Sequence, residues 1–166
     1  MPRPMLKLNC PPSPKNHLGP GRKEIYYMEC TVKWLNDVSF IAETGSGHLI
    51  TMDGAPEAGG RNLAPRPMEL LLAGAGGCSA FDVVLILKRG RHDVSDCAVQ
   101  VRATRAETDP KVFTHLHFHF TVSGRNLKPA AVERAVHLSA EKYCSASIMF
   151  GQIAEVTHDW EIVEPE

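Results

Sequence analysis

The sequence predicts an α+β fold in which strands alternate with one long apolar helix and a second, amphipathic one. Period-two alternation of apolar and polar residues marks strands in 28–53 and 94–123. Apolar residues from Pro67 to about Arg89 mark the long helix, and Pro129 suits the first turn of the second. We expect the inner stripe of the second helix at Val132, Val136, Ser139 and Tyr143. The resulting order, β-β-β-α-β-β-α-β, favours α+β rather than a parallel βαβ repeat.

The composition is that of an ordinary globular protein. Of 166 residues, 43% are hydrophobic and 22% are charged, which allows one domain with a real core. The formal net charge is −1. The chain therefore lacks the basic excess that binds a phosphate backbone, and we expect no nucleic-acid partner.

Residues 1–24 differ from the rest because they are rich in proline and glycine. We expect them to form a flexible tail or to belong to a mis-assigned start, since a clean strand pattern begins at Met28. Residues 25–166 then form a single domain. The N-terminus has no continuous apolar stretch of the kind that a signal peptide needs, so we expect a cytoplasmic protein.

The first strands are MECTVKW, VSFIAET and HLITMD, separated by turns at Asn36-Asp37 and Gly45-Ser46-Gly47. Loop 54–66 is rich in glycine and proline and is expected to form a wall or lid of a site. The long helix follows, and Gly90 ends it. Because this helix is apolar nearly all round, a chain of this size can hardly cover it alone, and we expect dimerisation around it.

The long helix also has about the length of a membrane span. However, Glu69 and Asp82 lie within residues 68–87, and charges at membrane depth are costly. We therefore expect a buried core helix and no association with a membrane.

Residues 94–105 and 111–123 form two long strands, and EVTHDWEIV forms the last one. On the second long strand, His115, His117 and His119 share one face. Side chains two apart on a strand are about 7 Å apart, too far for all three to bind one zinc ion. We expect a solvent-facing or interface strand and no metal site.

The five cysteines are an odd, scattered set without a CxxC motif, which does not suggest a secreted disulfide framework. Cys10 belongs to the tail. Cys30 and Cys97 fall on the apolar faces of their strands and are expected in the core.

Cys78 and Cys144 are the candidate functional thiols. Each could be a small buried hydrophobe, as free cysteine often is. Yet small neighbours let a substrate approach the Cys78 sulfur, Asp82 lies one turn away on the same face, and Lys142 beside Cys144 can lower a thiol pKa. If the two helices cross here, the sulfurs could act as a redox pair.

The segments PMELLLAGAGGCSAFDVV and LSAEKYCSAS resemble the OsmC/Ohr superfamily of thiol peroxidases, most closely its YhfA-like branch. The resemblance covers roughly Glu29 to Val163. It implies an OsmC-like fold, in which two long central helices carry the cysteines and antiparallel β-sheets wrap around them in an intertwined homodimer. No cofactor is expected.

The resemblance also implies an activity. Cys78 would be the peroxidatic thiol, which attacks the O–O bond of a small apolar hydroperoxide, and Cys144 would be the resolving thiol. An external dithiol reductant would restore the pair. The protein would then be an oxidoreductase with peroxiredoxin activity in the defence against oxidative stress.

The chain departs from the better-characterised branches in its activating residues. In those branches a glutamate follows the proline that opens the helix, and an arginine activates the thiolate; here Met68 follows the proline, and Glu69 comes one residue later. Glu69 and Arg66 are the candidate activating residues.

The alternative is that the protein is a non-catalytic member of the same fold, which binds a small apolar ligand or senses oxidants.

Overall fold

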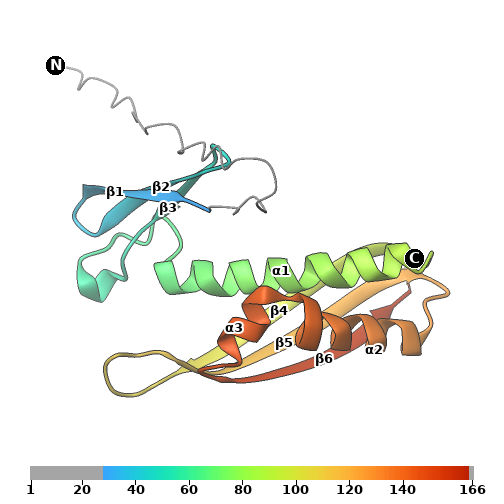
Figure 1. The fold of residues 1–166 in the computed structure, drawn as a ribbon. Coiled ribbons are helices and arrows are strands. Elements are labelled where there is room, and N and C mark those ends of the chain that lie inside the picture. The colour runs from blue at the N-terminus through green and yellow to red at the C-terminus, as the bar shows by residue number, and fades with distance from the viewer. Residues whose placement is uncertain (1–27, 165–166) are drawn as a thin grey trace, which may run out of the picture. The chain divides into compact units, whose positions relative to one another are not determined.

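The computed structural model describes residues 28–164 and divides the chain into two compact units, Met1–Pro67 and Met68–Glu166 (Figure 1). The expected tail and Cys10 lie outside the described residues. The mixture of helices with two three-stranded sheets confirms the α+β class.

The described part of the N-terminal unit is an antiparallel sheet with the order β1-β2-β3. Its strands are β1 (Cys30–Asn36), β2 (Ser39–Thr44) and β3 (Leu49–Met52). The expectation that Cys30 belongs to the core was wrong, because it is exposed together with Val32 and Trp34 on the same face of β1. In the described part of this unit, only a short 3₁₀ turn, η1 (Pro56–Ala58), accompanies the sheet, so no long helix covers that face within the unit.

One buried carboxylate organises the loop after β3. Asp53 is 2% exposed. Its two oxygens accept hydrogen bonds from the Ser39 hydroxyl at 2.8 Å and from the backbone N–H groups of Gly54, Arg61 and Leu63 at 2.9–3.1 Å. These bonds, that of Leu63 foremost, hold the pKa of Asp53 at about 2. The loop is therefore tied to the sheet through a carboxylate that stays ionised.

The C-terminal unit contains the long helix α1 (Pro67–Arg89), the hairpin β4 (Asp93–Arg105) and β5 (Phe113–Arg125), and the last strand β6 (Glu155–Val163). The hairpin is antiparallel, as expected. The expectation of antiparallel sheets was wrong for β6, which pairs parallel with β5 in the register Leu116↔Val156. The helical segment between these strands carries the chain back along the sheet, and such a crossover makes parallel pairing possible.

The second helical stretch is broken, and the expectation of two long helices was therefore wrong. It consists of α2 (Pro129–Leu138), a π-helical turn η2 (Ser139–Tyr143) and the short helix α3 (Ser145–Phe150). A π turn shifts the helical phase because its hydrogen bonds skip one more residue. Tyr143, expected on the inner stripe with Val136, is consequently exposed.

The core of this unit lies between the helices and one face of the sheet (Figure 1). Alternate residues of β5 form its centre, as the strand pattern predicted, and they are fully buried. The central buried side chains come from α1, β5 and α2: Val83, Leu87, Leu116, Phe118, Phe120, Val122, Val132 and Ala135.

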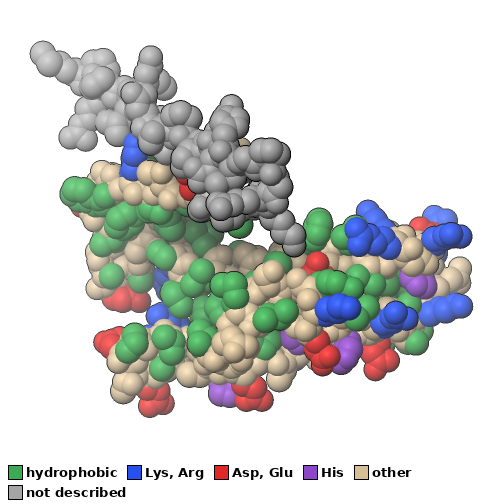
Figure 2. Space-filling view, viewed as in Figure 1, with side chains coloured by type: hydrophobic (Ala, Val, Ile, Leu, Met, Phe, Trp, Pro, Cys, Tyr) green, Lys and Arg blue, Asp and Glu red, His purple; other side chains and the backbone are tan. Residues whose placement is uncertain are grey.

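The opposite face of this sheet is polar. His115, His117 and His119 lie on it, and β6 places Glu155 and Asp159 beside them. Figure 2 shows histidine and acidic side chains gathered along the lower edge of the C-terminal unit. The three histidines therefore form a polar outer surface, as expected, and pair with carboxylates that a strand from a distant part of the sequence supplies.

Among the described residues, α1 is the one helix that is long and apolar enough to cross a membrane by length and composition. Its inner face, including Ala75, Val83 and Leu87, packs in the core of the unit. The core helix of a soluble protein can meet the same criteria of length and composition, and the packing of α1 agrees with such a helix.

Candidate functional site

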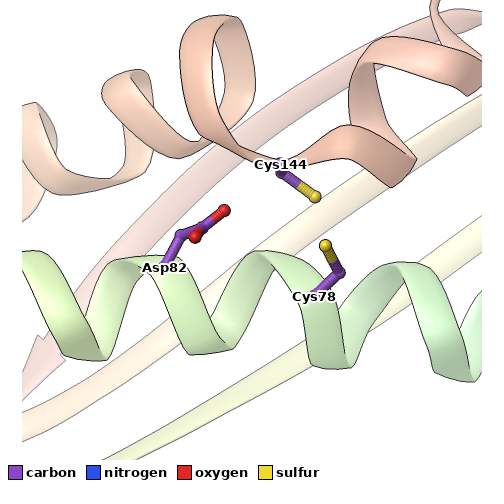
Figure 3. Close-up of side chains that lie close together, drawn as sticks. All are labelled: Cys78, Asp82 and Cys144. Atoms are coloured by element: carbon purple, nitrogen blue, oxygen red, sulfur yellow. The ribbon is translucent and has the colours of Figure 1, made fainter. Parts of the chain in front are cut away.

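The two candidate thiols lie side by side. Cys78 and Asp82 are one turn apart on the same face of α1, and Cys144 faces them from the junction between η2 and α3 (Figure 3). The two sulfur atoms and a carboxylate oxygen of Asp82 all lie within 4.8 Å of one another. All four described cysteines, Cys78 and Cys144 included, are free thiols.

The π turn determines where the Cys144 sulfur points. The Cys144 N–H donates to the carbonyl of Ser139 at 2.8 Å and closes the turn. Cys144 itself leaves the helical conformation, with φ −72° and ψ 99°, and begins α3. Its sulfur accepts a hydrogen bond from the Ser147 N–H at 3.4 Å. These contacts fix the Cys144 side chain in an orientation toward α1. A continuous helix would not impose this orientation.

Two buried hydroxyls connect the segments that carry the thiols. The Oγ atoms of Ser79 and Ser139 lie 3.1 Å apart, and both residues are fully buried. Ser139 Oγ is also 3.3 Å from the carbonyl oxygen of Ser79 and 3.5 Å from Oδ2 of Asp82. When Ser79 donates to Ser139, the Ser139 proton is available to Asp82, so these bonds join α1 to η2 beside the thiols.

The electrostatics of the site favour the neutral thiol at Cys78. Burial is the largest influence and raises its pKa, a hydrogen bond from the backbone of Ala146 lowers it, and Cys144 and the charge of Asp82 raise it further. Burial likewise raises the pKa of Asp82, against the hydrogen bond from Ser139. None of the largest influences on Cys78 comes from a cation.

The two candidate activating residues lie at the start of α1 and just before it. Glu69 is exposed in the first turn of α1, and nine residues at about 1.5 Å of rise separate it from Cys78 by roughly 13 Å along the helix. Arg66 is half-buried in the segment before α1 and belongs to the N-terminal unit. The carboxylate beside the thiols is that of Asp82, which the i, i+4 spacing from Cys78 indicated.

Ser139 is the site residue that the sequence did not reveal. It was expected only as part of the inner stripe of the second helix. A buried serine on a helical stripe gives no signal of its own, because its partners Ser79 and Asp82 lie about 60 positions earlier in the chain. Cys97, which we expected in the core, is half-buried on β4 and packs against the edge of the core.

The OsmC-like protein family model matches residues 59–159. The chain belongs to the OsmC-like family. It is 52% identical over 136 residues to protein YhfA of Escherichia coli strain K12, which covers 82% of this chain and 98% of the relative. The YhfA-like resemblance of the cysteine segments is thereby confirmed.

Solved structures agree with this membership. A hypothetical protein from Aquifex aeolicus VF5 is 31% identical, with a TM-score of 0.75 over 86% of this chain and 100% of that one. The organic hydroperoxide resistance protein OhrB of Bacillus subtilis is 17% identical, with a TM-score of 0.57 over 82% of this chain and 98% of that one, a likeness of fold. The OsmC-like fold is confirmed.

Membership of the OsmC-like family supports a redox or peroxide-related role. The inner face of α1 packs in the core of its unit, which agrees with the expected core helix.

Proposed function

We propose that this OsmC-like protein is a thiol-dependent organic hydroperoxide reductase in which Cys78 is the nucleophile and Cys144 the resolving thiol. The observation that carries the proposal is the pair of sulfur atoms within 4.8 Å of each other on segments about 66 positions apart in the chain. Reaching the S–S bond length of about 2 Å takes a movement of under 3 Å, which is within the range of side-chain rotation.

The burial of the two thiols supports these roles. Cys144 is fully buried, whereas Cys78 is half-buried, so an incoming hydroperoxide reaches Cys78 first. The Cys78 thiolate attacks the outer peroxide oxygen, the O–O bond breaks, and the alkoxide takes up a proton, which leaves a sulfenic acid and an alcohol. The Cys144 sulfur then displaces water and forms the disulfide, and an external dithiol reduces it again.

A cytoplasmic location follows from the same chemistry, because a regenerating dithiol is maintained where thiols are kept reduced.

The neutral state favoured at Cys78 limits the rate of attack on the hydroperoxide, because the thiolate is the nucleophile. We therefore expect slower turnover than in an enzyme with an arginine beside its thiolate.

The experiment measures consumption of cumene hydroperoxide with dithiothreitol as reductant. Cys78→Ser should abolish turnover. Cys144→Ser should retain one turnover and leave a sulfenic acid on Cys78 that a dimedone probe labels. Cys97→Ser is the matched control, because it removes a half-buried thiol of β4, and it should retain the wild-type rate. Equal rates for the wild type and Cys78→Ser would contradict the proposal.

A homodimer completes this proposal. On α1, Leu71 and Phe81 are 49% and 66% exposed, and the surface between them is open at Gly74 and Gly77, where an added Cβ would meet nothing within 4 Å. These residues form one stripe along the helix, which a second copy of α1 can cover at close range. Light scattering should give twice the chain mass for the wild type, and Phe81→Asp should lower it. A wild-type protein with the mass of one chain would contradict the dimer.

An apolar groove of about 330 Å³ supports the alternative of a small apolar ligand or an oxidant sensor. It lies between α1 and β4 and is lined by Leu72, Ala73, Gly76, Gly77, Ala80, Val99 and Val101. A binding protein should show slow turnover with any dithiol and an apolar compound released from the purified protein on denaturation. Fast turnover without such a compound favours the enzyme.

A further inference from the structure

The thiol pair and Asp82 also form a set of three metal-ligand atoms. The two sulfur atoms and one carboxylate oxygen lie within 4.8 Å of one another and point into the same space between α1 and the η2–α3 junction (Figure 3). Around tetrahedral zinc, with bonds of about 2.3 Å to sulfur and about 2 Å to oxygen, neighbouring ligand atoms are roughly 3.5–3.8 Å apart. A contraction of about 1 Å through side-chain rotation would therefore fit one ion.

We propose that the reduced protein binds one Zn²⁺ ion through Sγ of Cys78, Sγ of Cys144 and a carboxylate oxygen of Asp82. The fourth position of the tetrahedron is open to water or to another small ligand. Binding releases the two thiol protons and forms two zinc–thiolate bonds. It requires the thiols to be reduced and does not depend on peroxide reduction.

Each of the three ligand side chains already has a hydrogen-bond donor. The Ser147 N–H donates to Cys144 at 3.4 Å, the backbone of Ala146 to the Cys78 sulfur, and the Ser139 hydroxyl to Asp82 at 3.5 Å. Donors of this kind orient metal ligands and share the negative charge that collects on them. The arrangement therefore has an outer layer of partners as well as three ligands.

The ligand types select the metal. Two thiolates favour zinc and other thiophilic ions over calcium and magnesium, which take oxygen ligands. Two thiolates and a carboxylate also bring three negative charges together, and a divalent cation offsets most of them. The histidines of the outer sheet face are a separate group on β5 and supply none of these ligands.

One consequence rests on the function proposed above. Zinc engages the electron pairs with which the sulfurs would attack a peroxide, so the metal-bound form is protected from oxidation. When an organic hydroperoxide does oxidise it, the zinc dithiolate, one hydroperoxide and two protons give a disulfide, free Zn²⁺, an alcohol and water. Oxidation would then release the metal.

The test uses Co²⁺ as a spectroscopic probe for zinc in the reduced, metal-free, full-length protein. We expect one Co²⁺ per chain, a thiolate-to-cobalt charge-transfer band in the near ultraviolet, tetrahedral visible bands, and loss of all of them on adding Zn²⁺. Cys78→Ser and Cys144→Ser should abolish the charge-transfer band or reduce it by half or more. Asp82→Asn should weaken binding at least tenfold. Cys97→Ser and a His117→Gln/His119→Gln variant should bind as the wild type does.

A second measurement needs no substitution. Wild-type protein oxidised with diamide should lose the cobalt bands, and removal of the oxidant followed by reduction with a phosphine should restore them. The absence of a thiolate band at saturating Co²⁺, or a band unchanged in both cysteine variants, would overturn the zinc site. Hydroperoxide consumption is measured on the same metal-free protein, so failure of the enzyme proposal and failure of the metal site are read separately.

Discussion

The hydroxyl groups of Ser79 and Ser139 lie 3.1 Å apart in the interior, and they connect α1 to the π turn that carries Cys144. Both side chains are fully buried. Ser139 also reaches Asp82, so the contact ties the helix of Cys78, the segment of Cys144 and the carboxylate beside them into one arrangement.

Ser139→Ala should lower the free energy of unfolding by about 1–3 kcal/mol, because Ser79 loses a buried hydrogen-bond partner. It should also slow formation of the Cys78–Cys144 disulfide, since η2 is held less firmly against α1. Urea unfolding and the rate of diamide oxidation measure the two effects. Ser95→Ala, at an exposed position on β4, is the matched control and should leave both unchanged.

The double variant Ser79→Ala/Ser139→Ala separates the hydrogen bond from the lost volume. It leaves neither hydroxyl unpartnered, so the double variant should lose less unfolding free energy than the sum of the two single losses. Additive losses would mean that the two hydroxyls do not act on each other.

Asp53→Asn should destabilise the N-terminal unit most near neutral pH. The folded pKa of Asp53, about 2, is below the unfolded value of about 4, so its contribution is fully present above pH 4 and is lost as the pH falls to 2. The melting temperatures of variant and wild type should therefore converge toward pH 2. Ser39→Ala removes one of the four donors and should have a smaller effect. A constant difference from pH 2 to pH 7 would contradict this role.

Gly60→Ala should open the loop after β3. An added Cβ would lie 1.9 Å from the carbonyl oxygen of Gly54, far inside van der Waals contact. Gly47→Ala is the comparison, because its Cβ would meet nothing within 4 Å and only the left-handed φ of +83° opposes it, at about 1–2 kcal/mol. Limited proteolysis of the loop should be faster in Gly60→Ala alone, and equal cleavage of both variants would count against a steric origin.

The pair of His119 and Asp159 should make stability depend on pH. Their side chains are 2.6 Å apart; the hydrogen bond to Asp159 raises the pKa of His119, and the hydrogen bond to His119 lowers the pKa of Asp159. The histidine contribution is complete below about pH 6.5 and is lost as pH rises through its folded pKa. The carboxylate contribution is complete above about pH 4 and is lost as pH falls through its folded pKa.

The pair therefore contributes most between about pH 4 and 6.5. The melting temperature of Asp159→Asn should fall furthest below that of the wild type in this window and approach it at pH 9. Glu107→Gln, in the exposed loop between β4 and β5, is the control and should show no such window. A difference that is the same at pH 5 and pH 9 would refute the assignment.

The sequence alone determined the features that depend on local pattern. The bounds of α1, the buried face of β5 and the position of Cys78 within an apolar helix follow from periodicity, from Pro67 and from Gly90. The cysteine segments likewise carried enough similarity to indicate the family.

The tertiary structure decided what depends on contacts between distant segments. The parallel pairing of β6, the contact of Ser139 with Ser79 on α1 and the approach of the Cys144 sulfur to Cys78 each involve partners that lie far apart in the chain. A regular helical period would place Tyr143 inside and continue the helix past Cys144. In the structure, Ser139 contacts α1, the turn is widened and Cys144 has an extended backbone. The energy of the packing between η2 and α1 exceeds the small local preference for a regular helix. The local sequence pattern does not encode this contact and therefore did not predict it.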